Sequence, residues 1–77
     1  MNVSKIEHHA ILQLYSPLND WINYIFIVPI EAANSAFNII QSAFDDWNSL
    51  DTSITVSDYI TAELSASDIT CEVYMSA

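Results

Sequence analysis

The first third of the chain alternates between apolar and polar positions, a pattern typical of β-strands. From Lys5 to Tyr15 one set of alternate positions is apolar and the other mainly polar, which predicts a strand with one buried face. The apolar set is Ile6, Ala10, Leu12 and Leu14, and the opposite set contains Glu7, His9, Gln13 and Tyr15. Residues 16–20 have the composition of a turn, and Trp21 to Val28 is apolar at nearly every position. The strands Lys5–Tyr15 and Trp21–Val28 are predicted to form a hairpin around this turn, with Trp21–Val28 in the middle of the sheet.

After Pro29 the apolar positions recur every three and four residues, which indicates an amphipathic helix. Pro29 suits the first helical turn because its missing N–H would have no partner there, and Glu31 lies where the helix dipole favours an anion. The apolar stripe consists of Ala33, Ala36, Phe37, Ile40, Ala43, Phe44 and Trp47. Residues 48–53, which are polar apart from Leu50, are expected to end this helix.

A shorter helix and a last strand are predicted in the remaining third. Thr55 or Ser57 can cap a helix that runs to Leu64. After a loop at residues 65–68, the chain alternates again from Ile69 to Met75, which predicts a strand. Its inward positions are Ile69, Cys71, Val73 and Met75, and its outward positions are Thr70, Glu72 and Tyr74.

These elements predict a single α+β domain that spans residues 1–77. The order strand, strand, helix, short helix, strand is satisfied by a three-stranded, mostly antiparallel sheet with both helices packed on one face. The other face of this sheet is then left partly open to solvent or to a partner.

Composition excludes several classes of function. Ten Asp and Glu against one Lys and no Arg give a formal charge of −9, which repels phosphate and argues against direct binding of nucleic acid. Glycine is absent, so the P-loop, the dinucleotide fingerprint and the hydrolase nucleophile elbow are excluded. The single cysteine excludes an internal disulfide and a CxxC motif. The hydrophobic content of 52% predicts a folded chain.

The N-terminus and the hydropathy give an expected compartment. Residues 1–10 lack the basic patch, apolar run and cleavage site of a secretory signal, so we expect a cytoplasmic protein. The most apolar run, residues 21–30, is interrupted by Asn23 and Pro29 and is shorter than the roughly 20 residues of a spanning helix. No association with a membrane is predicted.

His8 and His9 are the only imidazoles and are candidate zinc ligands together with Glu7. A structural zinc site takes about four protein ligands, so the others would come from Asp side chains or from a second copy of the chain. Adjacent residues of a strand point to opposite faces, which limits how these side chains can converge. Ordinary strand histidines are the alternative interpretation.

The acidic residues at the end of the long helix do not form a recognised site. Counted from Asp46, an EF-hand loop would need a glycine and a carboxylate where Asp51 and Ser57 stand. No motif fixes a catalytic triad or a pair of catalytic carboxylates, so an enzyme is not predicted.

The whole set of carboxylates is the most informative feature. Eight of the ten lie from Glu31 onward, where the chain has no Lys or Arg. Carboxylates spread over a small rigid body can imitate the charge of DNA and occupy a groove lined by Arg and Lys on a nucleic-acid-binding protein. A solvated acidic surface is the alternative. The candidate contact residues are Asp45, Asp46, Asp51, Asp58, Glu63 and Glu72.

The chain also resembles the small acidic anti-CRISPR proteins of phages and prophages, in size, charge and style of sequence. The segments that carry the resemblance are residues 28–31 (VPIE), 43–47 (AFDDW), 57–60 (SDYI) and 72–74 (EVY), with Leu64 between the last two. The resemblance implies a stoichiometric inhibitor in the bacterial cytoplasm that binds a basic surface of a type II effector nuclease and prevents loading of guide or target DNA. The chain departs from the commoner pattern in lacking a glycine before the last strand.

Two other functions remain open at this stage. A module driven by apolar area would use the open sheet face, with Ile11, Tyr15 and Tyr74 at the contact, and a homodimer belongs to this class. A small metal-binding protein would use His8 or His9. Binding that depends strongly on salt would favour the electrostatic inhibitor, and binding that barely responds to salt would favour the apolar module.

Overall fold

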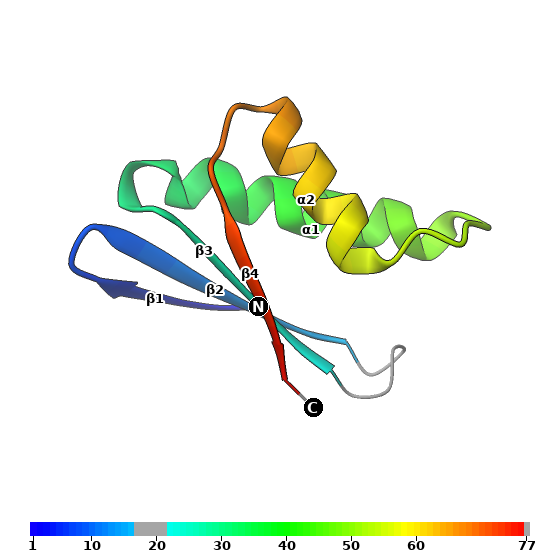
Figure 1. Cartoon of the computed structure of the whole chain (residues 1–77), viewed down its shortest axis with the longest axis horizontal. Coiled ribbons are helices and arrows are strands. Elements are labelled where there is room, and N and C mark those ends of the chain that lie inside the picture. Colours follow the sequence, from blue (N-terminus) through cyan, green and yellow to red (C-terminus); the bar gives the residue numbers. More distant parts are fainter. Residues whose placement is uncertain (17–21, 77) are drawn as a thin grey trace.

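The computed structural model describes residues 1–16 and 22–76, which form an antiparallel sheet with helices on one side (Figure 1). The elements are β1 (Asn2–Ile6), β2 (His9–Ser16), β3 (Ile22–Pro29), the 3-10 helix η1 (Ile30–Ala32), α1 (Ala33–Ser49), α2 (Val56–Ala66) and β4 (Glu72–Ser76). Within the described residues the sheet has four strands in the order β1-β2-β3-β4, and each pair of neighbours is antiparallel. The predicted α+β class is confirmed, and the predicted number of three strands is wrong.

The additional strand comes from the N-terminal segment, where one predicted strand is in fact a hairpin. Glu7 and His8 form a two-residue turn, and Ile6 pairs with His9 across it. Of these two turn residues only Glu7 has a positive φ, 55°, a position where hairpins favour glycine. The sequence lacks that glycine, so the turn gives no signal. Because Ile6 pairs with His9, the side chains of Ile6 and Ala10 lie on different faces of the sheet. The prediction that Ile6 shares one apolar face with Ala10, Leu12 and Leu14 is therefore wrong.

The predicted pairing of the next two strands is confirmed. β2 and β3 pair antiparallel over their full length, from His9 opposite Pro29 to Ser16 opposite Ile22. β3 lies between β2 and β4, in agreement with its predicted inner position. The predicted turn falls mainly on residues 17–20, which together with Trp21 lie outside the described residues.

The long helix begins later than predicted. Pro29 ends β3 and precedes η1, so α1 starts at Ala33. The predicted apolar stripe is nevertheless the face that α1 turns to the sheet, with Ala33, Ala36, Ile40 and Ala43 buried. In the described ranges, no helix combines the length and the apolarity needed to cross a membrane.

Both ends of α2 are closed by local hydrogen bonds. The hydroxyl of Thr55 accepts a bond from the Asp58 amide at 3.2 Å, which confirms Thr55 as the N-cap. At the other end the amide of Ile69 donates to the Leu64 carbonyl and the amide of Asp68 donates to the Ser65 carbonyl, both at 3.0 Å. This is the Schellman arrangement, in which the residue after the cap takes a positive φ. Asp68 has a φ of 60° and fills the position usually held by glycine.

The last strand begins three residues later than predicted, at Glu72, because residues 67–71 close α2 and lead the chain back to the sheet. Phe26 pairs with Val73 and Tyr24 with Met75, so Val73 and Met75 share the helix-covered face as their parity predicts. Val73 packs against the core, whereas Met75 is 62% exposed and is not the inward residue that was predicted.

The sheet therefore has two different faces. The core lies between the helices and one face, where Leu12, Phe26 and Val28 pack against Ile40 and Ile60. Both helices lie on this side of the sheet, and none of the described residues forms a layer on the other side (Figure 1). We call that other side the open face. It carries alternate residues of each strand, including Ile11, Ile25 and Ile27, which are half-buried.

Candidate functional surfaces

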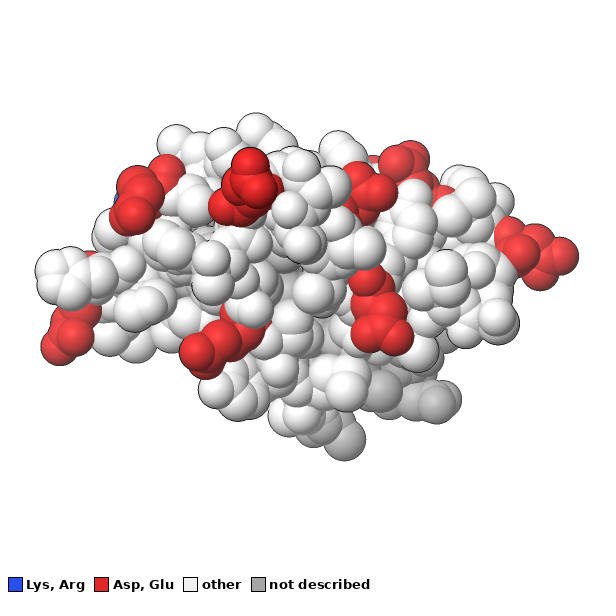
Figure 2. All heavy atoms as spheres, turned by 45° about the horizontal axis from the view of Figure 1, so that its top comes forward, with Lys and Arg blue, Asp and Glu red and all other residues white. Residues whose placement is uncertain are grey.

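Most of the carboxylates lie in the helical half of the molecule. Of the ten acidic residues only Asp20 is outside the described ranges, and seven of the other nine lie on η1, α1, α2 and the loops that follow the two α-helices. All seven are exposed. We call them the anionic layer: Glu31, Asp45, Asp46, Asp51, Asp58, Glu63 and Asp68. Figure 2 shows acidic side chains on this side as separate groups with neutral surface between them.

The anionic layer contains no compensating cation. The one Lys or Arg of the chain is Lys5 on β1, and Arg is absent. The predicted contact residues Asp45, Asp46, Asp51, Asp58 and Glu63 all belong to this layer. The charges of the protein are therefore distributed unequally between its helical layer and its sheet.

Two of these carboxylates line one groove between the helices. Asp46 comes from the end of α1 and Glu63 from α2, and both border a hollow of about 210 Å³. Ile39 and Ala43 contribute apolar atoms to the same hollow. A groove with an apolar lining and carboxylates beside it suits the side chain of Arg or Lys, whose long stem is apolar and whose head is charged. The remaining lining residues are Asn38 and Ser42.

Local hydrogen bonds hold the connection between α1 and α2, which carries Asp51. The Leu50 amide donates to the Trp47 carbonyl at 3.1 Å. The indole Nε1 of Trp47 donates to the Ile54 carbonyl at 2.8 Å, and the Ile54 amide donates to Oγ1 of Thr52 at 3.2 Å. The bond between Trp47 and Ile54 spans Asp51, and one of the other two bonds lies on each side of it. The Asp51 carboxylate is therefore displayed on a connection that hydrogen bonds hold in place.

Glu72 is the predicted contact residue that does not belong to the anionic layer. It pairs with Ile27 and lies on the open face, opposite to the side that the helices cover. The Tyr74 hydroxyl donates to Oε2 of Glu72 at 3.0 Å. This hydrogen bond, together with the negative charge of Glu72, raises the pKa of Tyr74 above its usual 10.0. A flat partner surface that contacts the helices would not reach Glu72.

The candidate zinc ligands lie at the hairpin turn. Glu7 and His8 form the turn itself, and the His8 carbonyl accepts a hydrogen bond from the Ile30 amide at 2.9 Å. His9 begins β2 and borders a hollow of about 240 Å³ on the open face together with Glu72. Within residues 1–16 and 22–76, no three His, Cys, Asp or Glu side chains come together to hold a metal ion. The zinc site therefore stays a prediction from the sequence, with no set of ligands gathered around it.

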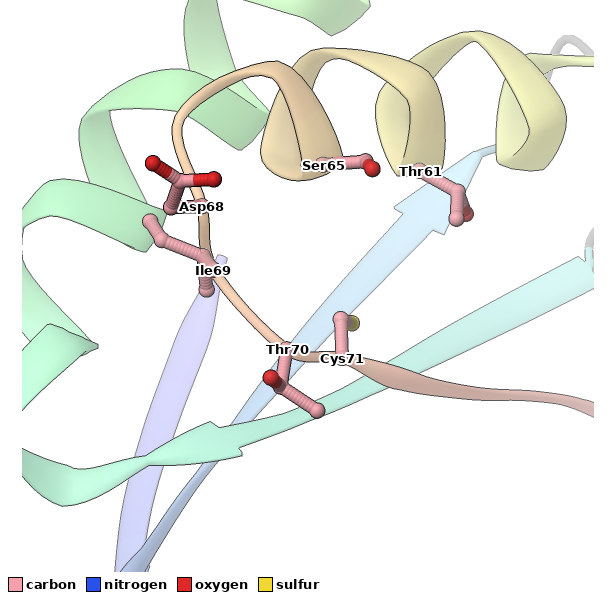
Figure 3. Close-up of a pocket in the computed structure, with 6 residues that line it drawn as sticks. All are labelled: Thr61, Ser65, Asp68, Ile69, Thr70 and Cys71. Carbon is pink, nitrogen blue, oxygen red and sulfur yellow. The ribbon is translucent and has the colours of Figure 1, made fainter.

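A third hollow lies where the chain passes from α2 to β4 (Figure 3). It has a volume of about 360 Å³, with Thr61 and Ser65 on the helix side and Thr70 and Cys71 on the other side. Burial is the main cause that raises the pKa of Cys71 from 9.0 to about 11; a backbone hydrogen bond with Ile27 lowers it in part, and the charge of Glu72 adds a smaller rise.

The chemistry of this hollow is limited by that pKa. With a pKa near 11, only about one thiol in ten thousand is ionised at pH 7, and the thiolate is the reactive form. The hydroxyl of Thr61 donates to the Ser57 carbonyl at 2.6 Å and is engaged within its own helix. The hollow is also lined by Ser65, Asp68, Ile69 and Thr70, and neither histidine of the chain is among its lining residues.

Sequence reasoning did not find the groove between α1 and α2. Asp46 and Glu63 are 17 positions apart, and their proximity depends on how the two helices pack.

No protein-family model, curated protein or solved structure matches this chain.

Proposed function

We propose that this protein is an acidic inhibitor that binds the nucleic-acid-binding surface of a basic protein in the bacterial cytoplasm. Its target would be a defence nuclease, with a type II CRISPR effector as the favoured one, and binding would prevent guide or target DNA from loading. The observation that carries the proposal is the anionic layer, in which seven exposed carboxylates lie without a Lys or Arg among them.

The distribution of the carboxylates favours recognition of an extended cationic surface. DNA presents one charge per roughly 1.7 Å of its axis, so a groove that grips DNA carries many Arg and Lys side chains over a broad area. Separate carboxylates along a rigid helical layer can meet such a groove at several points. The helices and loops that carry the layer hold no Lys or Arg, so no cation on these elements competes with the partner for the carboxylates.

Two acidic residues of the layer lie where their negative charge destabilises α1. Asp45 and Asp46 lie toward the C-terminal end of α1, where the helix dipole favours cations, and the last turn of α1 has no basic residue. The cost of such a placement is on the order of 0.3–1 kcal/mol per exposed charge. A role in binding explains why carboxylates occupy these positions.

The groove between α1 and α2 is the proposed central contact. A cationic side chain of the partner would lay its stem against Ile39 and Ala43 and bring its charge to Asp46 and Glu63. Charge-assisted hydrogen bonds of this kind fix the register of the two surfaces as well as add affinity.

The test is competition between this protein and DNA for a purified type II effector nuclease. We expect the wild-type protein to displace a fluorescent target DNA and to stop its cleavage at a stoichiometry near one. The double substitution Asp46→Asn and Glu63→Gln should weaken displacement at least tenfold, because it removes the two charges of the groove while keeping side-chain size.

A charge-matched variant provides the control. Glu7→Gln with Glu72→Gln removes the same two charges from outside the anionic layer, and we expect it to change displacement less than twofold. Equal loss in both double variants would mean that net charge alone acts and would refute the groove contact. Failure of the wild-type protein to displace DNA would refute the proposed target.

A further inference from the structure

The open face carries an apolar strip that none of the described residues covers. At its centre Ile11 of β2 pairs with Ile27 of β3, and Ile25 of β3 pairs with Tyr74 of β4. The three isoleucines are half-buried and Tyr74 is 52% exposed. Ile6 on the edge strand β1 extends the strip and is 58% exposed. Contiguous exposed apolar residues on a small protein mark a contact surface.

The same face is almost without charge in the described strands. Lys5 pairs with the buried Ala10 and therefore lies on the helix side of β1. Glu72 is the one acidic residue within a described strand, and its carboxylate accepts the hydrogen bond from Tyr74. A face with this composition is complementary to a second neutral, apolar face and not to the cationic surface that suits the anionic layer.

We propose that the open face is the interface of a homodimer in which two copies pack their sheets face to face. A central strip of isoleucines can contact the same strip of a second copy about a two-fold axis that lies in the interface, parallel to both sheets, as an isologous contact requires. Stacked sheets pack about 10 Å apart with their inner side chains interdigitated.

The size of the face fits a weak dimer. With strands about 4.8 Å apart and a rise of about 3.4 Å per residue, two strands of eight residues and two of five give a flat footprint of roughly 400 Å². For two partners this is roughly 800 Å² in total, which is below the roughly 1,200 Å² of stable interfaces and in the range of weak, transient contacts. We therefore expect dissociation constants in the micromolar range.

The charge distribution permits this dimer although each copy carries −9. Back-to-back sheets place the two anionic layers on the outside, separated by two sheets and their helices. With about 10 Å between packed sheets and about 10 Å for each helical layer, that separation is roughly 30 Å. The Debye length is about 8 Å at physiological ionic strength, so repulsion between the layers is largely screened.

The dimer is independent of the proposed inhibition and responds to salt in the opposite direction. The attraction is apolar and the residual repulsion is screened by salt, so dimerisation should hold or strengthen as salt rises. Binding to a cationic partner should weaken. Failure of one proposal therefore leaves the other standing.

Sedimentation velocity on the full chain, from 5 to 500 μM in 0.15 and 0.5 M NaCl, tests the dimer with two matched pairs of variants. On β4, Tyr74→Glu places a charge on the open face and Met75→Glu places it on the helix side of the same strand. On β1, Ile6→Glu and Val3→Glu form the corresponding pair. All four side chains are at least 43% exposed, so the substitutions are expected to leave the fold intact, which circular dichroism verifies.

We expect a wild-type dimer whose dissociation constant rises at least tenfold in Tyr74→Glu or Ile6→Glu and changes less than twofold in Met75→Glu and Val3→Glu. A dimer that survives both open-face substitutions, or that the control substitutions weaken equally, overturns the proposal. A wild-type chain that stays monomeric at 500 μM also overturns it and leaves the open face to a different protein.

Discussion

Nε1 of Trp47 donates a 2.8 Å hydrogen bond to the carbonyl of Ile54 and so ties the last turn of α1 to the residue before the cap of α2. The bond closes a loop of seven positions around Asp51. We predict that Trp47→Phe, which keeps an aromatic ring but removes this donor, lowers the free energy of unfolding by about 1 kcal/mol. It should also raise hydrogen exchange at the amides of residues 50–55.

Phe44→Leu is the control for this prediction. Phe44, like Trp47, is half-buried on α1 and packs against the core, so its truncation also costs stability. It should leave exchange in residues 50–55 unchanged. If both variants speed exchange there equally, the indole hydrogen bond does not hold the connection.

The turn after α2 gives a prediction about backbone conformation. Asp68 has a φ of 60°, where a residue with a Cβ is unfavourable and where its carboxylate also opposes the helix dipole. Asp68→Gly is expected to raise the free energy of unfolding by about 0.5–1 kcal/mol, measured by urea denaturation. Asp68→Ala, which keeps the Cβ but loses the local polar group, should not be stabilising by this amount; if it is, backbone conformation is not the cause.

Two residues with positive φ, Glu7 and Asp68, lie where the fold differs from the prediction. The periodicity of α1 was sufficient because a long stripe from Ala33 to Ala43 fixes one buried face whatever its neighbours do. The hairpin at Glu7 and the turn at Asp68 depend on conformations that sequence patterns attribute to glycine, and this chain has none. The sequence therefore predicts three strands where the sheet has four, and it places the start of the last strand three residues too early.

The thiol of Cys71 predicts a decline of stability at alkaline pH. Its pKa is raised from 9.0 to about 11 mainly by burial, so the folded state favours the protonated thiol. This contribution is fully present below pH 9 and is lost as the pH rises from about 9 to 11. Two pKa units correspond to about 2.7 kcal/mol, which solvent screening at this half-buried site reduces to the order of 1 kcal/mol.

Urea denaturation of the wild type and of Cys71→Ala between pH 8 and 11 measures this effect. The wild type should lose stability more steeply over that range, because alanine has no proton to release. The raised pKa of Tyr74 acts in the same direction in both proteins and cancels in the comparison. Parallel curves for the two proteins would contradict the assignment to Cys71.

The candidate surfaces show a similar division between what the sequence reveals and what packing adds. The excess of carboxylates and the absence of cations after Lys5 are visible in the sequence. The convergence of Asp46 and Glu63 on one groove depends on the packing of α1 against α2, and no local pattern encodes it. The parity of β4 did predict Glu72 on the outward side, which is what separates it from the other contact residues.

The central claim is that carboxylates of the helical layer drive binding to a cationic protein surface, and its most direct test is the salt dependence of that binding. The association constant of the wild-type protein for a type II effector nuclease would be measured by calorimetry from 0.05 to 0.5 M NaCl. Since salt screens attraction between exposed charges, the account predicts a fall of at least about tenfold over this range. An association constant that stays level or increases with salt would contradict it.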